Sequence, residues 1–258
     1  MASYYAADPA HLGKTDSGKG RRLMGSAGVW CTDASPGAIH RLSQMQFDWV
    51  ALDMQHGRYD RRDLIEAARG WDTTAALLVV RVPSSEFTGI GLALDVGADV
   101  VIVPQVDTPA DAQASVDAAR YPPAGRRSFG QLQPIWGAAA RDPADANTDT
   151  CCAVMIESAT ALDNVEGIAA VPGVGMLFVG PNDLSLSLGT TISHLLDDQS
   201  KTSALQRIVD AARANNIPAG AFGGDPGTAR RFSDRGFTFV ACATDGWLLH
   251  QGAQSAFA

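Results

Sequence analysis

The sequence has no cluster of Lys or Arg, and its 258 residues carry a formal net charge of -8. Proteins that bind nucleic acid neutralise phosphates with clustered basic side chains, so this charge balance argues against that class. No apolar run is long enough to span a bilayer, and the first eleven residues lack the apolar core of a signal peptide. We therefore expect a cytoplasmic protein that binds neither nucleic acid nor membrane.

Cysteine is scarce as well, and the four cysteines show neither the spacing of a zinc site nor the framework of a small secreted domain. They are Cys31, Cys151, Cys152 and Cys242. This pattern favours buried thiols in a reducing compartment.

Nucleotide-binding signatures are missing too. The sequence contains no Rossmann glycine pattern, and the segment Gly13–Gly20, GKTDSGKG, only approximates a phosphate-binding loop. Gly20 stands where Ser or Thr would bind magnesium, and no apolar strand precedes the segment. We interpret residues 1–22 as a flexible lead, followed by one domain over residues 23–258.

From residue 23 onward, short apolar strand patterns alternate with helical patterns, which predicts an α/β protein with a single (β/α)8 (TIM) barrel. The runner-up is a doubly wound open sheet. The barrel is favoured because unusual polar residues follow the strands, where the active site of a barrel lies. A long loop, Tyr121–Thr148, is expected to be functional or to carry short helices of its own. The expected strands lie near Leu23–Trp30, Phe47–Leu52, Ala76–Val80, Val100–Val103, Ala153–Ile156, Met176–Val179, Pro218–Phe222 and Phe237–Ala241.

Two carboxylates occupy matching places in two successive strand patterns. Glu157 follows the fifth strand and Asp183 follows the sixth, with a helix-sized segment between them. Such crossovers join parallel neighbours, so both acids should emerge at the same edge and could share one divalent cation. The alternative is that Glu157 caps a helix and Asp183 stabilises a turn, and this stretch alone leaves both open.

Other polar residues follow neighbouring strands. His56 is suited to proton transfer near neutral pH, and Arg81 to an oxyanion or a carboxylate. The alternatives are a structural histidine and an ion pair at the barrel rim. Asp53 either orients His56 or joins the strand-end hydrogen bonds, and the sequence does not decide. Trp30 also lies at a strand end and is a candidate for substrate binding.

These residue types fit the chemistry of a 2-oxo acid. Mg²⁺ or Mn²⁺ held by two carboxylates keeps several water positions, which the carboxylate and keto oxygen of such an acid could replace. The cation would then stabilise an enolate. The turn Gly180–Asp183 opens a helix, whose free backbone N–H groups could hold a substrate carboxylate.

Ordered motifs from Trp30 to Asp245 resemble the metal-dependent pyruvate aldolases of the HpcH/HpaI family. The resemblance implies a (β/α)8 barrel that cleaves 4-hydroxy-2-oxo acids reversibly to pyruvate and an aldehyde. It also implies Mg²⁺, Mn²⁺ or Co²⁺ as cofactor and a homo-oligomer, a hexamer or a trimer. The motifs are FDWVALDMQHG (Phe47–Gly57), VRVP (Val80–Pro83), LDVGAD (Leu94–Asp99), VPQVDT (Val103–Thr108), ARYPPAGRRSFG (Ala119–Gly130), MIES and FVGPNDLS.

By this resemblance, Glu157 and Asp183 match the metal ligands, His56 the acid/base residue and Arg81 the arginine that stabilises the oxyanion. The backbone of Asn182 and Asp183, in the turn that includes Gly180 and Pro181, matches the carboxylate site. Gln55, a further candidate for substrate binding, stands where many members have Glu.

Asp95 matches the acid that pairs with the family's histidine. It lies late in the third helix, toward the opposite face of the barrel, so we expect it to meet His56 only across a subunit boundary. Met155 stands where some members carry Gln, which predicts altered donor contacts.

Two alternatives to the aldolase remain. One is a related lyase that acts on citramalyl or malyl substrates through the same enolate. The other is a barrel that binds an oxo acid without turnover, and the presence of Glu157, Asp183, Arg81 and His56 weighs against it.

Overall fold

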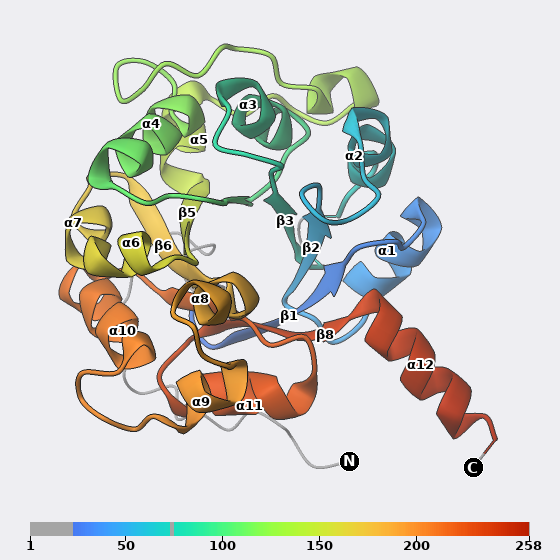
Figure 1. The fold of residues 1–258 in the computed structure, drawn as a ribbon. Helices are drawn as coiled ribbons and strands as arrows, with labels where there is room; N and C mark the ends of the chain where they lie inside the picture. The colour runs from blue at the N-terminus through green and yellow to red at the C-terminus, as the bar shows by residue number, and fades with distance from the viewer. Residues whose placement is uncertain (1–22, 73–74, 258) are drawn as a thin grey trace.

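Eight parallel strands close into one barrel in the computed structural model, which describes residues 23–72 and 75–257 (Figure 1). Each strand pairs with the next along the chain, and β1 pairs with β8. The predicted (β/α)8 barrel is therefore confirmed, and the open sheet is wrong. Our interpretation of residues 1–22 lies outside the described residues. The strands are β1 (Ser26–Cys31), β2 (Trp49–Asp53), β3 (Leu77–Arg81), β4 (Val100–Val103), β5 (Cys151–Ile156), β6 (Val174–Val179), β7 (Ala219–Phe222) and β8 (Phe239–Thr244).

Helices surround the barrel, and a polar side chain caps the start of most of them. Thr108, for example, forms a capping box with Asp111 at the start of α4, and a proline follows at the first helical position. The loop after α4 contains η3 and α5, so the expectation that it carries short helices is confirmed. The helices are α1 (Pro36–Ser43), α2 (Arg61–Ala68), α3 (Phe87–Asp95), α4 (Pro109–Ala119), η3 (Gln133–Trp136), α5 (Pro143–Asp149), α6 (Ala159–Asp163), α7 (Val165–Ala169), α8 (Pro181–Ser187), α9 (Ile192–Asp197), α10 (Ala204–Ala214), α11 (Pro226–Asp234) and α12 (Asp245–Ser255).

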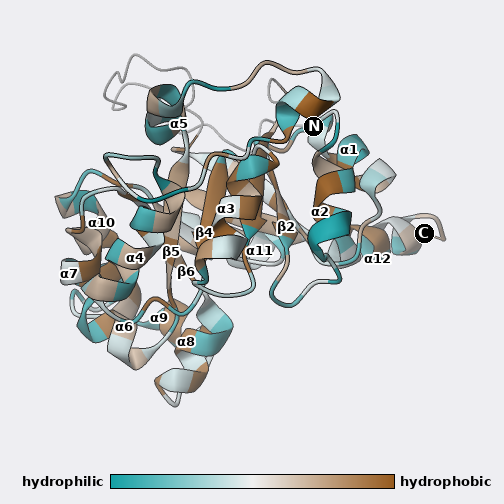
Figure 2. Cartoon of the chain, turned by 90° about the horizontal axis from the view of Figure 1, so that it is seen from above, coloured by the Kyte–Doolittle hydropathy of each residue, from teal (hydrophilic) through white to brown (hydrophobic). Residues whose placement is uncertain are grey.

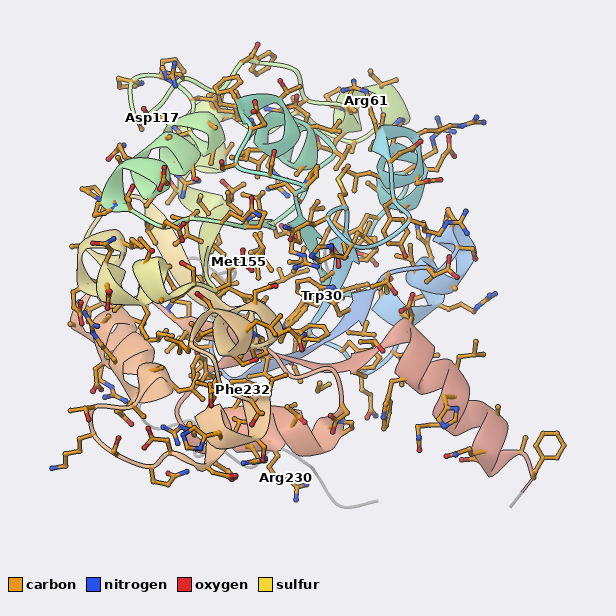
Figure 3. The ribbon with its side chains drawn as sticks, in the orientation of Figure 1. Trp30, Arg61, Asp117, Met155, Arg230 and Phe232 are labelled. Carbon is orange, nitrogen blue, oxygen red and sulfur yellow. The ribbon has the colours of Figure 1, made fainter. Side chains whose placement is uncertain are left out.

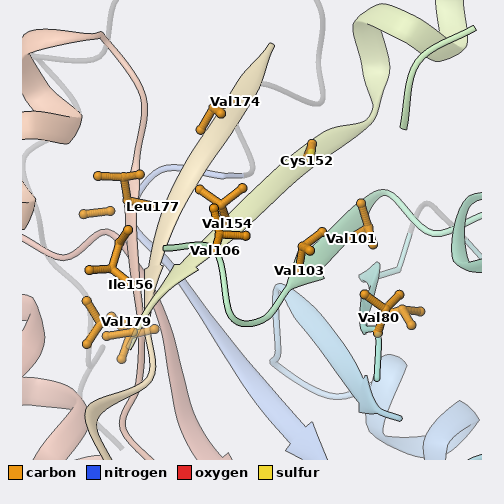
Figure 4. Packing of buried hydrophobic residues seen from close by; sticks show 14 of the residues in the cluster. Val80, Val101, Val103, Val106, Cys152, Val154, Ile156, Val174, Leu177 and Val179 are labelled. Atoms are coloured by element: carbon orange, nitrogen blue, oxygen red, sulfur yellow. The ribbon is translucent and has the colours of Figure 1, made fainter. Parts of the chain in front are cut away.

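The strands bury both faces, as parallel strands covered by helices must. Their outward side chains, such as Val101, Val154 and Ile156, form a layer beneath the helices (Figure 4). Their inward side chains fill the barrel, where the rings of Trp49 and Phe239 stack with centroids 4.3 Å apart. Figure 2 shows the same division, with hydrophobic strands inside and hydrophilic helix surfaces outside.

The eighth strand begins two residues later than the sequence pattern predicts. Phe237 donates its backbone N–H to Phe232 O and so belongs to the turn that ends α11, where Gly236 has a φ of +95°. The rings of Phe232 and Phe237 meet edge to face, 5.3 Å apart. The buried side chain of Phe237 thus closes a helix end rather than starting a strand.

The last helix, α12, projects away from the barrel (Figure 1). None of its residues is buried, and Leu249 is 77% exposed. Among the helices of the described residues, none is both long and apolar enough to span a membrane.

Candidate active site

Charged side chains collect at the mouth formed by the carboxyl ends of the strands. Asp53 ends β2, Arg81 ends β3 and Glu157 directly follows β5. Asp183 lies in the first turn of α8, which begins immediately after β6. Because all eight strands are parallel, these residues share one mouth of the barrel, as the sequence predicts.

Asp53 is the centre of a hydrogen-bonded cluster. Its carboxylate accepts two hydrogen bonds from the Arg81 guanidinium, with Nε to Oδ1 at 2.9 Å, and one from Trp30 Nε1 at 3.1 Å. The backbone N–H groups of Gln55 and His56 also donate to Oδ1. Asp53 therefore fixes the arginine, and it holds the loop after β2 through its backbone.

The ionisation of Asp53 follows from these contacts. Burial alone would raise the pKa of its carboxyl group, but the hydrogen bonds and positive charge of Arg81 oppose this effect. Hydrogen bonds from the Trp30 side chain and the His56 backbone N–H also lower the pKa of Asp53, so that it lies below its ordinary value. Arg81 is 8% exposed, which places its ion pair inside the mouth rather than at an exposed rim.

Glu157 is a buried carboxylate with one fixed oxygen. It is 7% exposed, and its Oε1 accepts a hydrogen bond of 2.7 Å from the backbone N–H of Gln105. Gln105 itself has a φ of +57°, a left-handed conformation that is uncommon for a residue other than glycine. The side chain that caps α6 is Ser158, so the alternative in which Glu157 caps that helix is wrong.

The pKa of Glu157 reflects its burial and the charged groups around it. Burial raises the pKa of Glu157, the Gln105 N–H lowers it, and the negative charge of Asp183 raises it again. Arg81 and His56 act on the same carboxyl group in the lowering direction, and the net shift is upward. Glu157 therefore lies within electrostatic reach of the three other predicted site residues.

The two acids have the donor chemistry of a hard cation site. The pKa of Glu157 is raised by burial and also by the charge of a second carboxylate, and a divalent cation would relieve both effects. No group of three or more His, Cys, Asp or Glu suited to a metal occurs among the described residues. A pair of carboxylates with the other positions left to water and substrate is the pattern that suits Mg²⁺.

His56 and Gln55 lie on the loop that Asp53 holds. His56 is exposed, and Gln55 is half-buried, with an Oε1 that finds no hydrogen-bond partner in the described part of the chain. Gly57 allows the tight turn, because a Cβ there would lie 2.2 Å from Asp53 O. The loop therefore presents an imidazole at the mouth on a fixed backbone.

The turn before α8 brings Glu157 close to the start of that helix. An added Cβ on Gly180 would lie 2.8 Å from Glu157 Oε2, so only glycine fits here without displacing the acid. Gly180 offers no side chain to cap α8, and Pro181 is buried. The backbone N–H groups of Asn182 and Asp183 thus belong to an uncapped helix start.

Asp95 lies away from this mouth. It is the last residue of α3, which runs back along the barrel to the amino end of β4, and its carboxylate accepts a 2.9 Å hydrogen bond from Arg127. Within one chain the structure therefore does not bring Asp95 to His56.

Sequence reasoning missed the role of two contacts. The backbone of Gln105 positions Glu157, and Ser158 donates a 2.5 Å hydrogen bond to Asp107, which ties the loop after β4 to the start of α6. The only sequence signal was the polar residues that follow these two strands, Gln105 and Asp107 after β4 and Glu157 and Ser158 after β5.

Comparisons with known proteins identify the family of this chain. The HpcH/HpaI aldolase/citrate lyase family matches residues 26–251. A 4-hydroxy-2-oxovalerate aldolase of Novosphingobium aromaticivorans is 36% identical over 88% of this chain and 86% of its own. A hydroxypyruvate/pyruvate aldolase of Paraburkholderia phytofirmans is 37% identical over 88% and 90%. The crystal structure of an HpcH/HpaI aldolase/citrate lyase family protein from Burkholderia cenocepacia superposes with a TM-score of 0.83, at 32% identity over 92% and 96% of the two chains.

Proposed function

Because the chain belongs to the HpcH/HpaI aldolase/citrate lyase family and is a carbon–carbon lyase, we propose that it is a divalent-metal-dependent pyruvate aldolase. It cleaves 4-hydroxy-2-oxo acids reversibly to pyruvate and an aldehyde. The observation that carries the proposal is the buried Glu157 carboxylate, held by the Gln105 N–H at 2.7 Å at the mouth that Asp183 also reaches. Burial and the charge of Asp183 raise its pKa, while Gln105, Arg81 and His56 act in the lowering direction. Mg²⁺, Mn²⁺ or Co²⁺ held by the two acids would act as a Lewis acid on the 2-oxo group.

The remaining steps fall to this chain's own side chains. In the cleavage direction, His56 takes the proton of the C4 hydroxyl, directly or through a water molecule. The C3–C4 bond then breaks and the aldehyde leaves. The electron pair of the broken bond stays with the pyruvate fragment, which becomes an enolate. Arg81 stabilises the enolate oxygen, and a proton delivered to C3 completes pyruvate.

Asp53 makes this use of Arg81 possible. It binds Nε and one terminal nitrogen of the guanidinium, which fixes the plane of the group and leaves the other terminal nitrogen unbound by Asp53. In this proposal that nitrogen binds the substrate. The Arg81 guanidinium carbon also lies 5.1 Å from the centre of the Trp30 ring. Trp30 and Asp53 therefore position the arginine before any substrate arrives, which is the preorganisation that electrostatic catalysis requires.

The protein acts as a homo-oligomer in this proposal. Asp95 and its partner Arg127 lie at the mouth opposite His56, and Phe129, two residues after Arg127, is 65% exposed. An exposed aromatic side chain beside this ion pair suits a subunit interface. Asp95 of one subunit would then pair with His56 of another.

Exchange of the pyruvate methyl protons in D₂O tests the proposal, because exchange reports enolate formation without any aldehyde. We expect exchange that needs a divalent cation and disappears in Glu157→Gln, followed by addition to aldehydes from a panel. Exchange without aldehyde addition but with turnover of citramalyl or malyl substrates would select the related lyase. Binding of pyruvate without any exchange would identify a non-catalytic barrel, and either result overturns the aldolase.

A further inference from the structure

We propose that Met155 determines donor specificity, so that the enzyme takes 2-oxo acids whose C3 carries only hydrogen or an alkyl group. A donor with a hydroxyl on C3, such as hydroxypyruvate, is disfavoured. This inference rests on the proposed function, because it names the donor class of the same site.

Met155 lies directly beside the candidate metal ligand. It lies on β5 two residues before Glu157, which directly follows the strand, so both side chains face the same side, and Met155 is 1% exposed. A Cβ added to Gly180 would lie 2.8 Å from Met155 Cε and 2.8 Å from Glu157 Oε2. The thioether methyl and the carboxylate therefore flank the same point at the start of α8.

The wall around this methyl group is apolar. Met155 belongs to the buried cluster inside the barrel that also contains Trp30 and Phe178, against which Phe222 packs. The Trp30 ring lies 5.7 Å from Phe178 and 5.3 Å from Phe222, centroid to centroid. Figure 3 labels Trp30 and Met155 near the centre of the ring of strands.

The polar groups of the mouth at β2 and β3 form hydrogen bonds with one another. Asp53 binds Arg81, and the indole N–H of Trp30 also donates to Asp53. Trp30 therefore turns its polar atom toward β2, and its ring lies between the apolar wall and the Arg81 guanidinium, whose carbon is 5.1 Å from the ring centre. In this proposal the C3 substituent of a 2-oxo acid held at Glu157 meets the thioether side of this boundary, because Met155 Cε and Glu157 Oε2 flank the same point.

This arrangement favours a methyl group over a hydroxyl. A hydroxyl placed against a thioether and aromatic rings loses its hydrogen bonds to water and gains at most a weak sulfur acceptor. An apolar pocket rejects an added hydroxyl by up to about a hundredfold. We therefore expect kcat/KM for pyruvate to exceed that for hydroxypyruvate by roughly ten- to a hundredfold.

Donor competition tests the proposal with one aldehyde and saturating Mg²⁺. Met155→Gln, which supplies an amide, should shift the pyruvate-to-hydroxypyruvate ratio of kcat/KM toward hydroxypyruvate by about tenfold or more. Met155→Leu should keep the preference for pyruvate. Met45→Gln, at a position that is 58% exposed after α1, is the matched control and should leave both rates unchanged.

A binding measurement complements the rates. In protein labelled with ¹³C at the methionine methyl groups, the Met155 signal, identified by its loss in Met155→Leu, should move when pyruvate and Mg²⁺ are added. The five other methionines in the sequence serve as internal references.

The outcomes separate the two claims. Equal use of both donors by the wild-type enzyme, an unshifted ratio in folded Met155→Gln, or a Met155 signal indifferent to pyruvate would each overturn the specificity claim alone. Absence of methyl-proton exchange with pyruvate in D₂O would overturn the proposed aldolase, and the specificity claim with it.

Discussion

Asp53 and Arg81 are register partners on neighbouring strands β2 and β3, and their side chains form a two-bond ion pair inside the barrel mouth. Asp53 is 1% exposed and Arg81 is 8% exposed. A buried pair of this kind contributes little net stability relative to apolar residues, but removing one partner leaves an uncompensated charge. The pair is therefore better understood as a device that fixes the arginine.

Replacing Asp53 by Asn should lower the free energy of unfolding by about 3 kcal/mol, because the buried Arg81 loses its counter-charge. Activity should fall as well, since the guanidinium is no longer fixed. Urea unfolding at neutral pH measures the first effect. The control is Asp33→Asn, which breaks the exposed ion pair with Arg58 and should change stability by less than about 1 kcal/mol. Equal effects of the two substitutions would contradict this role of Asp53.

The pH dependence of the metal-free protein should report Glu157. Its folded pKa lies above the ordinary value of 4.5, so its contribution to stability is complete below that value and is lost as the pH rises through the folded pKa. Glu157→Gln cannot ionise, so in EDTA its melting temperature should rise relative to that of the wild type as the pH increases from 4 to 8. A melting-temperature difference that stays constant over this range would disprove the raised pKa of Glu157. Added Mg²⁺ should raise the melting temperature of the wild type at neutral pH.

Removal of either acid should weaken cation binding strongly. Glu157→Gln and Asp183→Asn should each weaken Mn²⁺ binding, measured by electron paramagnetic resonance, by at least about a hundredfold, the upper range for residues that only support a ligand. Glu166→Gln removes an acid of similar type on α7, where it pairs with Arg207, and should bind Mn²⁺ normally. Unchanged Mn²⁺ affinity in both site variants would exclude this pair as ligands.

Gly180→Ala should weaken cation binding without unfolding the protein. The new Cβ would lie 2.8 Å from Glu157 Oε2, so the carboxylate must move, and we expect about a tenfold loss of Mn²⁺ affinity. Gly91→Ala in α3, where a Cβ would meet nothing within 4 Å, is the matched control and should be neutral or slightly stabilising. Identical Mn²⁺ titrations for the two variants would show that close approach at Gly180 does not matter.

Mixed oligomers should reveal whether Asp95 acts across an interface. Asp95→Asn and His56→Ala are each expected to reduce activity strongly. If Asp95 of one subunit pairs with His56 of another, co-refolded mixtures contain some sites with both native residues, so activity should recover above either variant alone. A mixture that shows only the average of its components would place Asp95 outside the site. Asp33→Asn mixed with His56→Ala gives the baseline.

The barrel could be predicted because its signal is local. Strand patterns such as Val100–Val103 and the helical patterns between them reflect burial on both faces of a strand and one face of a helix, and each is readable within a few residues. The acid that follows β5 could be found for the same reason. Phe237 was misassigned to a strand because a buried aromatic residue that closes a helix reads, in isolation, like the start of a strand.

The partners of the site residues could not be read from the sequence. The sequence left open whether Asp53 orients His56, and the structure joins its carboxylate to Arg81, 28 residues away, and to the indole of Trp30. Nothing local indicates that the backbone of Gln105 holds Glu157, 52 residues later, because the two residues meet only when β4 and β5 pair.

The sequence by itself determined that the chain forms a parallel barrel and that acids, an arginine and a histidine follow its strands. These features depend on the order of polar and apolar residues, which the burial of each element dictates. Only the tertiary structure decided that the Asp53 carboxylate fixes Arg81, that the pKa of Glu157 is raised, and that Met155 lies beside Glu157. Those outcomes depend on distances and dielectric environment between segments that meet only when the barrel closes.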